Sequence, residues 1–177
     1  IAGRTHWQHA LPMTLGLKFA GFLDEIGRHA ERLDAVRARV LTAQLWGGGG
    51  TLASLGDDAR AVQAAFCRRL RLTVPTAPWF AARDRTMELV SFIGMLASTL
   101  ERIVLEVGRS SGTEIAEMFE PTVSGQVGSS TMPQKRNPIQ CERAAAVCKL
   151  IRGLVPVMQE CGVVEHDRDM STAVAEW

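Results

Sequence analysis

Residues 83–110, RDRTMELVSFIGMLASTLERIVLEVGRS, determine the fold class. Their apolar residues recur at alternating spacings of four and three, which predicts a long α-helix with one continuous apolar face. Three further apolar residues widen this face, so we expect the helix to contact more than one neighbour. The central stripe comprises Leu89, Ile93, Leu96, Leu100, Ile103 and Val107, and the widening residues are Phe92, Met95 and Val104.

The same periodicity continues on both sides of this segment. It predicts a helix over residues 15–40, a shorter one over 57–71, and a last one from about 137 to 161, in which Pro156 should cause a kink. No segment of useful length alternates as a strand does. The sequence therefore predicts an all-α fold, a bundle of long helices that we expect to assemble with other copies. The residues expected to face inward on the first and last helices are Phe19, Phe22, Leu23, Ile26, Ala30, Leu33 and Val36, and Ala144, Val147, Ile151, Leu154 and Met158.

Composition excludes several classes of function. Of the 177 residues, 46% are hydrophobic, which is enough for one domain with a sizeable core. The formal net charge of +1 argues against a nucleic-acid partner, and no apolar run is long enough to span a membrane. The cysteines lack zinc-ligand spacing, and Cys141 and Cys148, on one helical face, are expected to be buried thiols. With no signal peptide and reduced thiols, we expect a cytoplasmic protein.

A polar loop separates the last two predicted helices. Residues 120–134 read EPTVSGQVGSSTMPQ, and the glycines predict a mobile loop over about residues 120–135. Lys135 and Asn137 follow, which places a cation, an amide and free backbone N–H groups at a helix N-terminus, a cluster that attracts carboxylates. No base lies beside the serines, so a nucleophilic triad is unsupported. A serine near the lysine could instead be held as an alkoxide that removes a proton from carbon, and the alternative is a flexible loop that only caps the helix.

Residues 128–138, GSSTMPQKRNP, closely resemble the signature loop GSSxMPxKxNP of the fumarase/aspartase superfamily. Residues 3–8, GRTHWQ, are similar to its GRTHxQ segment, and the long helices resemble its central bundle. The resemblance implies a homotetramer whose site combines three subunits, with no metal or cofactor. His9 is expected only at the rim of the site, and His29 as a hydrogen-bonded core residue. The resemblance implies Ser129 as the catalytic base, His6 as the general acid, and Thr5, Gln8, Ser130, Met132, Lys135, Asn137 and Arg168 as substrate-binding residues.

Two branches of the superfamily are similar to this chain. The 3-carboxy-cis,cis-muconate cycloisomerase branch is resembled at residues 50–56, at Pro78 and Trp79, at 119–121, and at 165–168 with Glu176 and Trp177. The adenylosuccinate lyase branch is resembled at residues 125–127, 135–138 and 166–169. Each resemblance has departures. Ala173 and Trp177 replace the expected serine and arginine of a phosphate pocket, whereas Phe80 and Gln134 replace two histidines of the cycloisomerases.

These resemblances imply a cycloisomerase that acts on an unsaturated polycarboxylate. The alternatives are adenylosuccinate lyase, or a related lyase that releases fumarate, and a structural member of the superfamily without activity. The chain begins at Ile1 and reads as the central helical domain of a longer polypeptide. Since the superfamily's first active-site segment would lie upstream of Ile1, we expect residues 1–177 alone to have negligible activity.

Overall fold

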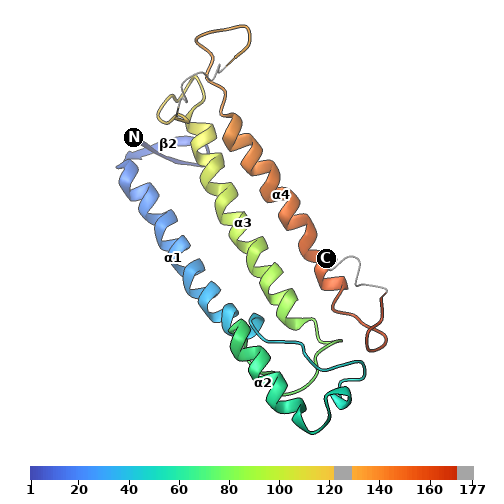
Figure 1. Cartoon of the computed structure of the whole chain (residues 1–177). Helices are drawn as coiled ribbons and strands as arrows, with labels where there is room; N and C mark the ends of the chain where they lie inside the picture. Colours follow the sequence, from blue (N-terminus) through green and yellow to red (C-terminus); the bar gives the residue numbers. More distant parts are fainter. Residues whose placement is uncertain (122–128, 171–177) are drawn as a thin grey trace. The chain divides into compact units, whose positions relative to one another are not determined.

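The computed structural model describes residues 1–121 and 129–170, which form two compact units. The hairpin unit comprises Ile1–Ala30 and Ile93–Gly153, and the α2 unit comprises Glu31–Phe92 together with the chain from Leu154 onward. Three long helices contribute residues to both units (Figure 1). They are α1 (Leu15–Val40), α3 (Asp84–Ser110) and α4 (Ile139–Glu160).

The predicted helices are confirmed to within two residues at each end. α1 has the predicted bounds, and α2 (Ala59–Leu70) follows a short 3₁₀ helix, η1 (Ala53–Asp58). α2 ends where Arg71 adopts a left-handed conformation with φ 57°, and its N–H donates to the Arg68 carbonyl at 3.3 Å. α4 continues past Pro156 to Glu160, so the proline does not end the helix. Within the described residues, none of the helices is both long and apolar enough to cross a membrane.

The expectation that the chain contains no strand is wrong at its N-terminal end. β1 (Ala2–Thr5) and β2 (Gln8–Pro12) form an antiparallel hairpin, in which Thr5 pairs with Gln8 and Arg4 with His9. All five residues of β2 are exposed, so the buried face that produces an alternating pattern is missing. Gly3 is buried against the second strand, where an added Cβ would lie 2.6 Å from the Leu11 carbonyl oxygen.

In the hairpin unit, the α3 segment lies between the α1 and α4 segments (Figure 1). His29 of α1 is 4% exposed, and its Nε2 lies 2.8 Å from Oγ1 of Thr99 on α3. The Thr99 hydroxyl donates to Oε1 of Glu25 at 2.7 Å, so the histidine nitrogen is the donor to Thr99. His29 is therefore the hydrogen-bonded core residue that the sequence predicts. On the α4 side, Arg152 pairs with the buried Glu101.

Much of the predicted apolar stripe is exposed in the single chain. On α4, Val147 and Leu154 are 53% and 61% exposed, although both were expected to face inward. The buried residues of the first half of α4 are instead Cys141, Ala145 and Cys148, which confirms the prediction for the two cysteines. The predicted apolar stripes of α1, α3 and α4 are therefore wider than the surface that other elements of the same chain cover. Other exposed members of the predicted stripes are Phe19, Leu23, Leu33, Ile93, Met95 and Leu100.

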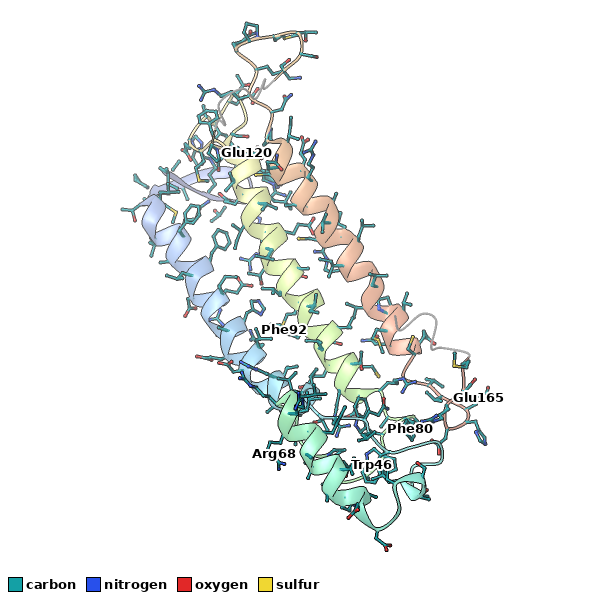
Figure 2. All side chains as sticks on the ribbon, viewed as in Figure 1. Trp46, Arg68, Phe80, Phe92, Glu120 and Glu165 are labelled. Carbon is teal, nitrogen blue, oxygen red and sulfur yellow. The ribbon has the colours of Figure 1, made fainter. Side chains whose placement is uncertain are left out.

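The α2 unit has its own core, built around Trp46, Cys67 and Gln63, which are at most 4% exposed (Figure 2). Gln63 donates to the Leu45 carbonyl at 2.7 Å, which satisfies its buried amide. Four consecutive glycines, residues 47–50, belong to this unit. Gly50 has φ +79°, and a Cβ there would lie 3.1 Å from Cγ of Pro78, so two loops approach each other closely at this point.

Candidate active site

The signature segment enters the described structure at Ser129 and leads directly into α4. The Oγ of Ser129 accepts hydrogen bonds from the backbone N–H groups of Thr131 at 3.4 Å and Met132 at 3.2 Å. The N–H of Lys135 donates to the Met132 carbonyl at 3.1 Å, which closes a turn. Two N–H donors directed at one serine oxygen favour its alkoxide form, because hydrogen bonds to a charged form stabilise it. The geometry is thus compatible with Ser129 as a base.

Part of the predicted loop cannot be compared with the structure. Residues 122–128, which include Gly128 and the residues 125–127, lie outside the described residues. The same holds for Ala173, Glu176 and Trp177 at the other end of the chain. The predicted mobility of the loop and the sequence features read from these residues therefore stay predictions.

The second half of the signature segment borders a cavity of about 720 Å³. Three of the predicted substrate-binding residues, Met132, Lys135 and Asn137, line it together. The opposite wall is the C-terminal end of α3 and the residues after it, which the sequence did not single out. The remaining lining residues are Gly108, Ser111, Gly112, Thr113, Ala116, Phe119, Gln134, Arg136 and Pro138.

The N-terminus of α4 differs from the expectation of free N–H groups. Oε1 of Glu120 accepts a hydrogen bond from the backbone N–H of Cys141 at 2.6 Å (Figure 2 labels Glu120). Burial acts to raise the pKa of Glu120, but hydrogen bonds from Cys141 and from the Gln140 backbone hold that pKa below its ordinary value. A carboxylate of the protein itself therefore caps this helix, and the Cys141 N–H is not free in the way that the sequence predicted.

His6 occupies the turn of the hairpin. His6 and Trp7 are its two central residues, with φ 48° and 65°, as a two-residue turn of this twist requires. Neither is glycine, so the turn holds two strained residues, a condition found at functional sites. His6 borders a cavity of about 420 Å³. Its lining residues are Arg4, His6, Trp7, His9, Lys18, Glu106, Arg109, Ser110, Glu114 and Ile115.

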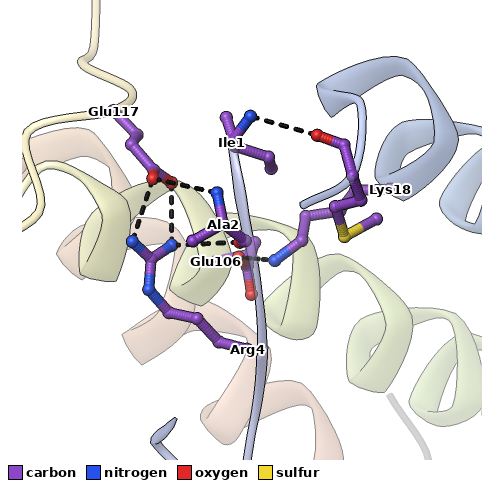
Figure 3. A network of polar contacts seen from close by, with 7 residues as sticks. Ile1, Ala2, Arg4, Lys18, Glu106 and Glu117 are labelled. Carbon is purple, nitrogen blue, oxygen red and sulfur yellow. Dashed lines mark hydrogen bonds and ion pairs between the residues drawn. The ribbon is translucent and has the colours of Figure 1, made fainter. Parts of the chain in front are cut away.

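Ion pairs hold three of the residues that line this cavity, Arg4, Lys18 and Glu106 (Figure 3). The Arg4 guanidinium donates to both oxygens of Glu117, at 2.8 and 2.9 Å, and the Ala2 N–H adds a third contact at 3.4 Å. The Arg4 hydrogen bonds are the largest of the effects that lower the pKa of Glu117 to about 2. Lys18 pairs with Glu106 between α1 and α3. The sequence analysis missed Arg4 and Glu117 as site residues, although Arg4 lies inside the GRTHWQ segment.

Arg168 belongs to the α2 unit. Its guanidinium carbon lies 4.1 Å from the centroid of the Phe80 ring, and Nη2 donates to the Gly47 carbonyl at 3.0 Å. Arg168 and Gly47 both have positive φ, 63° and 70°. The residue that replaces a histidine of the cycloisomerases thus contacts the predicted substrate arginine, whose role in binding stays a prediction.

The predicted residues form two groups in the hairpin unit. Lys135 and Asn137 line one cavity and His6 lines the other, with His9 beside it, while Thr5, Gln8 and Ser130 are exposed. Within residues 1–121 and 129–170, no three His, Cys, Asp or Glu side chains are grouped so as to hold a metal ion.

Comparison with known proteins identifies the family. The sequence pattern of a family described as lyase matches residues 1–153. The 3-carboxy-cis,cis-muconate cycloisomerase of Pseudomonas aeruginosa is 42% identical over 100% of this chain and 39% of its own length. The N-acetyl-S-(2-succino)cysteine lyase of Enterococcus italicus is 41% identical over the same shares. The adenylosuccinate lyase of Pyrococcus abyssi is 40% identical over 98% of this chain and 39% of its own length.

A solved structure agrees with these matches. The 3-carboxy-cis,cis-muconate lactonizing enzyme of Pseudomonas putida is similar with a TM-score of 0.90 and 40% identity, over 99% of this chain and 39% of that one. The chain therefore spans about two fifths of the length of these relatives. Three different activities occur among relatives of nearly equal identity, so identity alone does not select a substrate. The chain belongs to this lyase family, within the fumarase/aspartase superfamily.

Proposed function

We propose that the full-length protein is a cycloisomerase of the 3-carboxy-cis,cis-muconate type, which interconverts an unsaturated polycarboxylate and its lactone. The observation that carries this proposal is the segment from Ser129 to Asn137. It contains a serine oxygen held by two N–H donors. A few residues further along, it supplies a lysine and an amide that line one cavity. The similarity to two cycloisomerases at 40–42% identity supports the choice of substrate class. No metal or cofactor takes part in the proposed chemistry.

The mechanism is an addition and elimination next to a carboxylate. In the elimination direction, the Ser129 alkoxide removes a proton from the carbon beside a carboxylate, and the electron pair moves into that carboxylate to give an aci-carboxylate dianion. Lys135 and Asn137 stabilise the added charge. The bond from the next carbon to oxygen then breaks with its electron pair. Lactone formation runs these steps backwards: a substrate carboxylate oxygen adds to the double bond, and the Ser129 hydroxyl returns the proton to carbon.

His6 favours a second candidate, a lyase that releases fumarate. A carboxylate oxygen leaves as a stable anion and needs no proton, whereas a departing amine nitrogen does. A general acid in the hairpin turn is therefore more useful for an N-linked succinate, such as adenylosuccinate, than for a lactone. Ala173 and Trp177 replace the serine and arginine that a phosphate pocket would need. Adenylosuccinate therefore remains the second choice of substrate. An S-linked succinate is a third substrate of the same chemistry, suggested by a relative at 41% identity.

We also propose that the chain is the central domain of a homotetramer with shared active sites. Large apolar side chains on α1, α3 and α4, such as Leu23, Leu100 and Leu154, are exposed in the single chain. His6 and Lys135 line different cavities of this chain, and we propose that another subunit contributes one of them to each active site. Thr5, Gln8, Ser130 and Arg168 are proposed as further substrate contacts, which assembly would bring to the site.

The test is turnover by the full-length protein. Purified enzyme is incubated separately with 3-carboxy-cis,cis-muconate, adenylosuccinate and N-acetyl-S-(2-succino)cysteine, and substrate loss is followed by absorbance and mass spectrometry. We expect turnover of the muconate, and Ser129→Ala should lower kcat by roughly 10²–10⁴-fold. Ser98→Ala is the matched control, because Ser98 is exposed and its hydroxyl donates to the Gly94 carbonyl of its own helix.

Each other outcome selects a different function. Turnover of a succinate conjugate alone, with a strong loss in His6→Asn, would replace the cycloisomerase by the lyase. No turnover of any of the three substrates would favour the structural member. An active Ser129→Ala variant would refute the proposed base.

A further inference from the structure

We propose that Arg4 and Glu117 are positioning residues that hold His6 in place for proton transfer. The inference rests on the role of His6 as general acid, which belongs to the second candidate function, the lyase that releases fumarate. His6 lies in a two-residue turn, and the strand after it, β2, is exposed along its whole length. The hairpin by itself therefore offers the turn little support. The hairpin is held instead by Glu117, which accepts two hydrogen bonds from Arg4 and one from the Ala2 backbone N–H (Figure 3).

Glu117 in turn is anchored to α3. Its backbone N–H donates to the carbonyl of Ser110, the last residue of that helix, at 2.9 Å. A continuous chain of contacts thus runs from the end of α3 through Glu117 and Arg4 to β1, which ends one residue before His6. The side chains of Arg4 and Glu117 are only 20% and 21% exposed, so solvent screens this pair less than an open surface pair.

The fork geometry of arginine matters here. Two parallel N–H···O bonds fix the orientation of the guanidinium as well as its distance, whereas a lysine holds a carboxylate as a point charge. Arg4→Lys therefore preserves the charge but frees the hairpin to rotate about the contact. A catalytic group that is displaced by about 1 Å can cost roughly 100-fold in rate. We expect Arg4→Lys to lower kcat by about 10- to 100-fold with little change in KM.

The experiment is a double-mutant cycle in the full-length enzyme with its best substrate. Wild type, Arg4→Lys, His6→Ala and the double variant are compared by kcat, KM and the pH dependence of kcat. If Arg4 acts through His6, the Arg4 substitution lowers kcat in the wild-type background but not in His6→Ala. Glu117→Gln should behave as Arg4→Lys does, and a charge reversal, Arg4→Glu with Glu117→Arg, should restore part of the activity.

Arg39→Lys is the matched control. Arg39 also donates two hydrogen bonds to one carboxylate, that of Glu88, but this pair lies in the α2 unit. The Arg39→Lys substitution should leave kcat within about twofold of the wild-type value. Equal losses from Arg4→Lys in both backgrounds, or no loss in either, would overturn the positioning role. If His6→Ala itself is fully active, the proposed general acid is wrong, and the cycle separates that result from a failure of the pair.

Discussion

The Glu120 carboxylate accepts a 2.6 Å hydrogen bond from the backbone N–H of Cys141, in the first turn of α4. The positive end of the α4 dipole is therefore already neutralised by a carboxylate of the same chain. Under the proposed function, the side chains of Lys135 and Asn137 therefore contribute more than the helix end to attracting the substrate.

Glu120→Ala should destabilise the protein by about 0.5–2 kcal/mol, because the first turn of α4 loses its cap. The folded-state pKa of Glu120 lies below its ordinary value. Its contribution is therefore complete above the unfolded-state pKa of about 4.3 and is lost as the pH falls through the lower folded-state value. Thermal melts of wild type and variant should differ most near neutral pH and converge as the solution becomes more acidic.

Glu142→Ala is the control for this cap. Glu142 lies in the same first turn of α4 but is exposed. Its removal should change the stability by no more than about 0.5 kcal/mol. Equal effects of the two substitutions, or a Glu120 effect that grows as the pH falls, would contradict the capping role.

Lys135→Met should lower kcat/KM by about 10²–10³-fold, because the helix end cannot replace the lost cation. Steady-state kinetics on the full-length enzyme measures this loss. Lys149→Met is a suitable control, since Lys149 lies on α4, ten residues beyond the first helical residue, Ile139, and its partner is Glu101 at 3.6 Å. If Lys135→Met retains near-normal kcat/KM, then another group binds the reacting carboxylate.

The helices could be predicted from the sequence because each carries its own periodic signal. α1 was predicted with its observed bounds, since a run of 3.6-residue periodicity needs no partner to be recognised. The hairpin could not be predicted in this way. Its outer strand, β2, buries none of its five residues, and its turn uses His6 and Trp7 with positive φ in place of the glycine or asparagine that usually marks such a turn.

The contacts of individual site residues could not be predicted, because the partners lie far apart in the sequence. Arg4 and Glu117 lie 113 residues apart, so nothing local in the sequence indicates that they pair. Glu120 was noticed only as part of a branch resemblance, while its capping bond to Cys141 becomes visible only when the loop is closed. The residues of the signature segment itself, by contrast, follow one another in the chain, and six of them line one cavity as a group.

Thr99→Val should destabilise the protein by about 1–3 kcal/mol, because the buried His29 nitrogen and the Glu25 carboxylate both lose the hydroxyl between them. Thr99 is 2% exposed, so water cannot easily replace the hydroxyl. Urea unfolding monitored by circular dichroism measures the change. Thr99→Ser keeps the hydroxyl and should retain most of the stability. A Val variant as stable as the Ser variant would show that the hydroxyl contributes nothing.

Cys141 should react slowly with iodoacetamide in the folded protein. Burial, and then the neighbouring Glu120 carboxylate, raise the pKa of its thiol to about 11, so that at pH 8 the reactive thiolate is rare. Glu120→Gln removes the negative charge but not the burial, and it should therefore speed alkylation of Cys141 at pH 8. Mass spectrometry after a short pulse of reagent measures the rate.

Cys67 provides the internal control for this comparison. It is buried in the α2 unit, so its alkylation should be equally slow in wild type and in Glu120→Gln. Both cysteines should react quickly in urea, where burial no longer protects them. If Glu120→Gln accelerates both thiols alike, the variant has opened the whole protein and the effect of the charge is not established. If it accelerates neither, burial alone accounts for the inertness of Cys141, and the carboxylate serves only to cap α4.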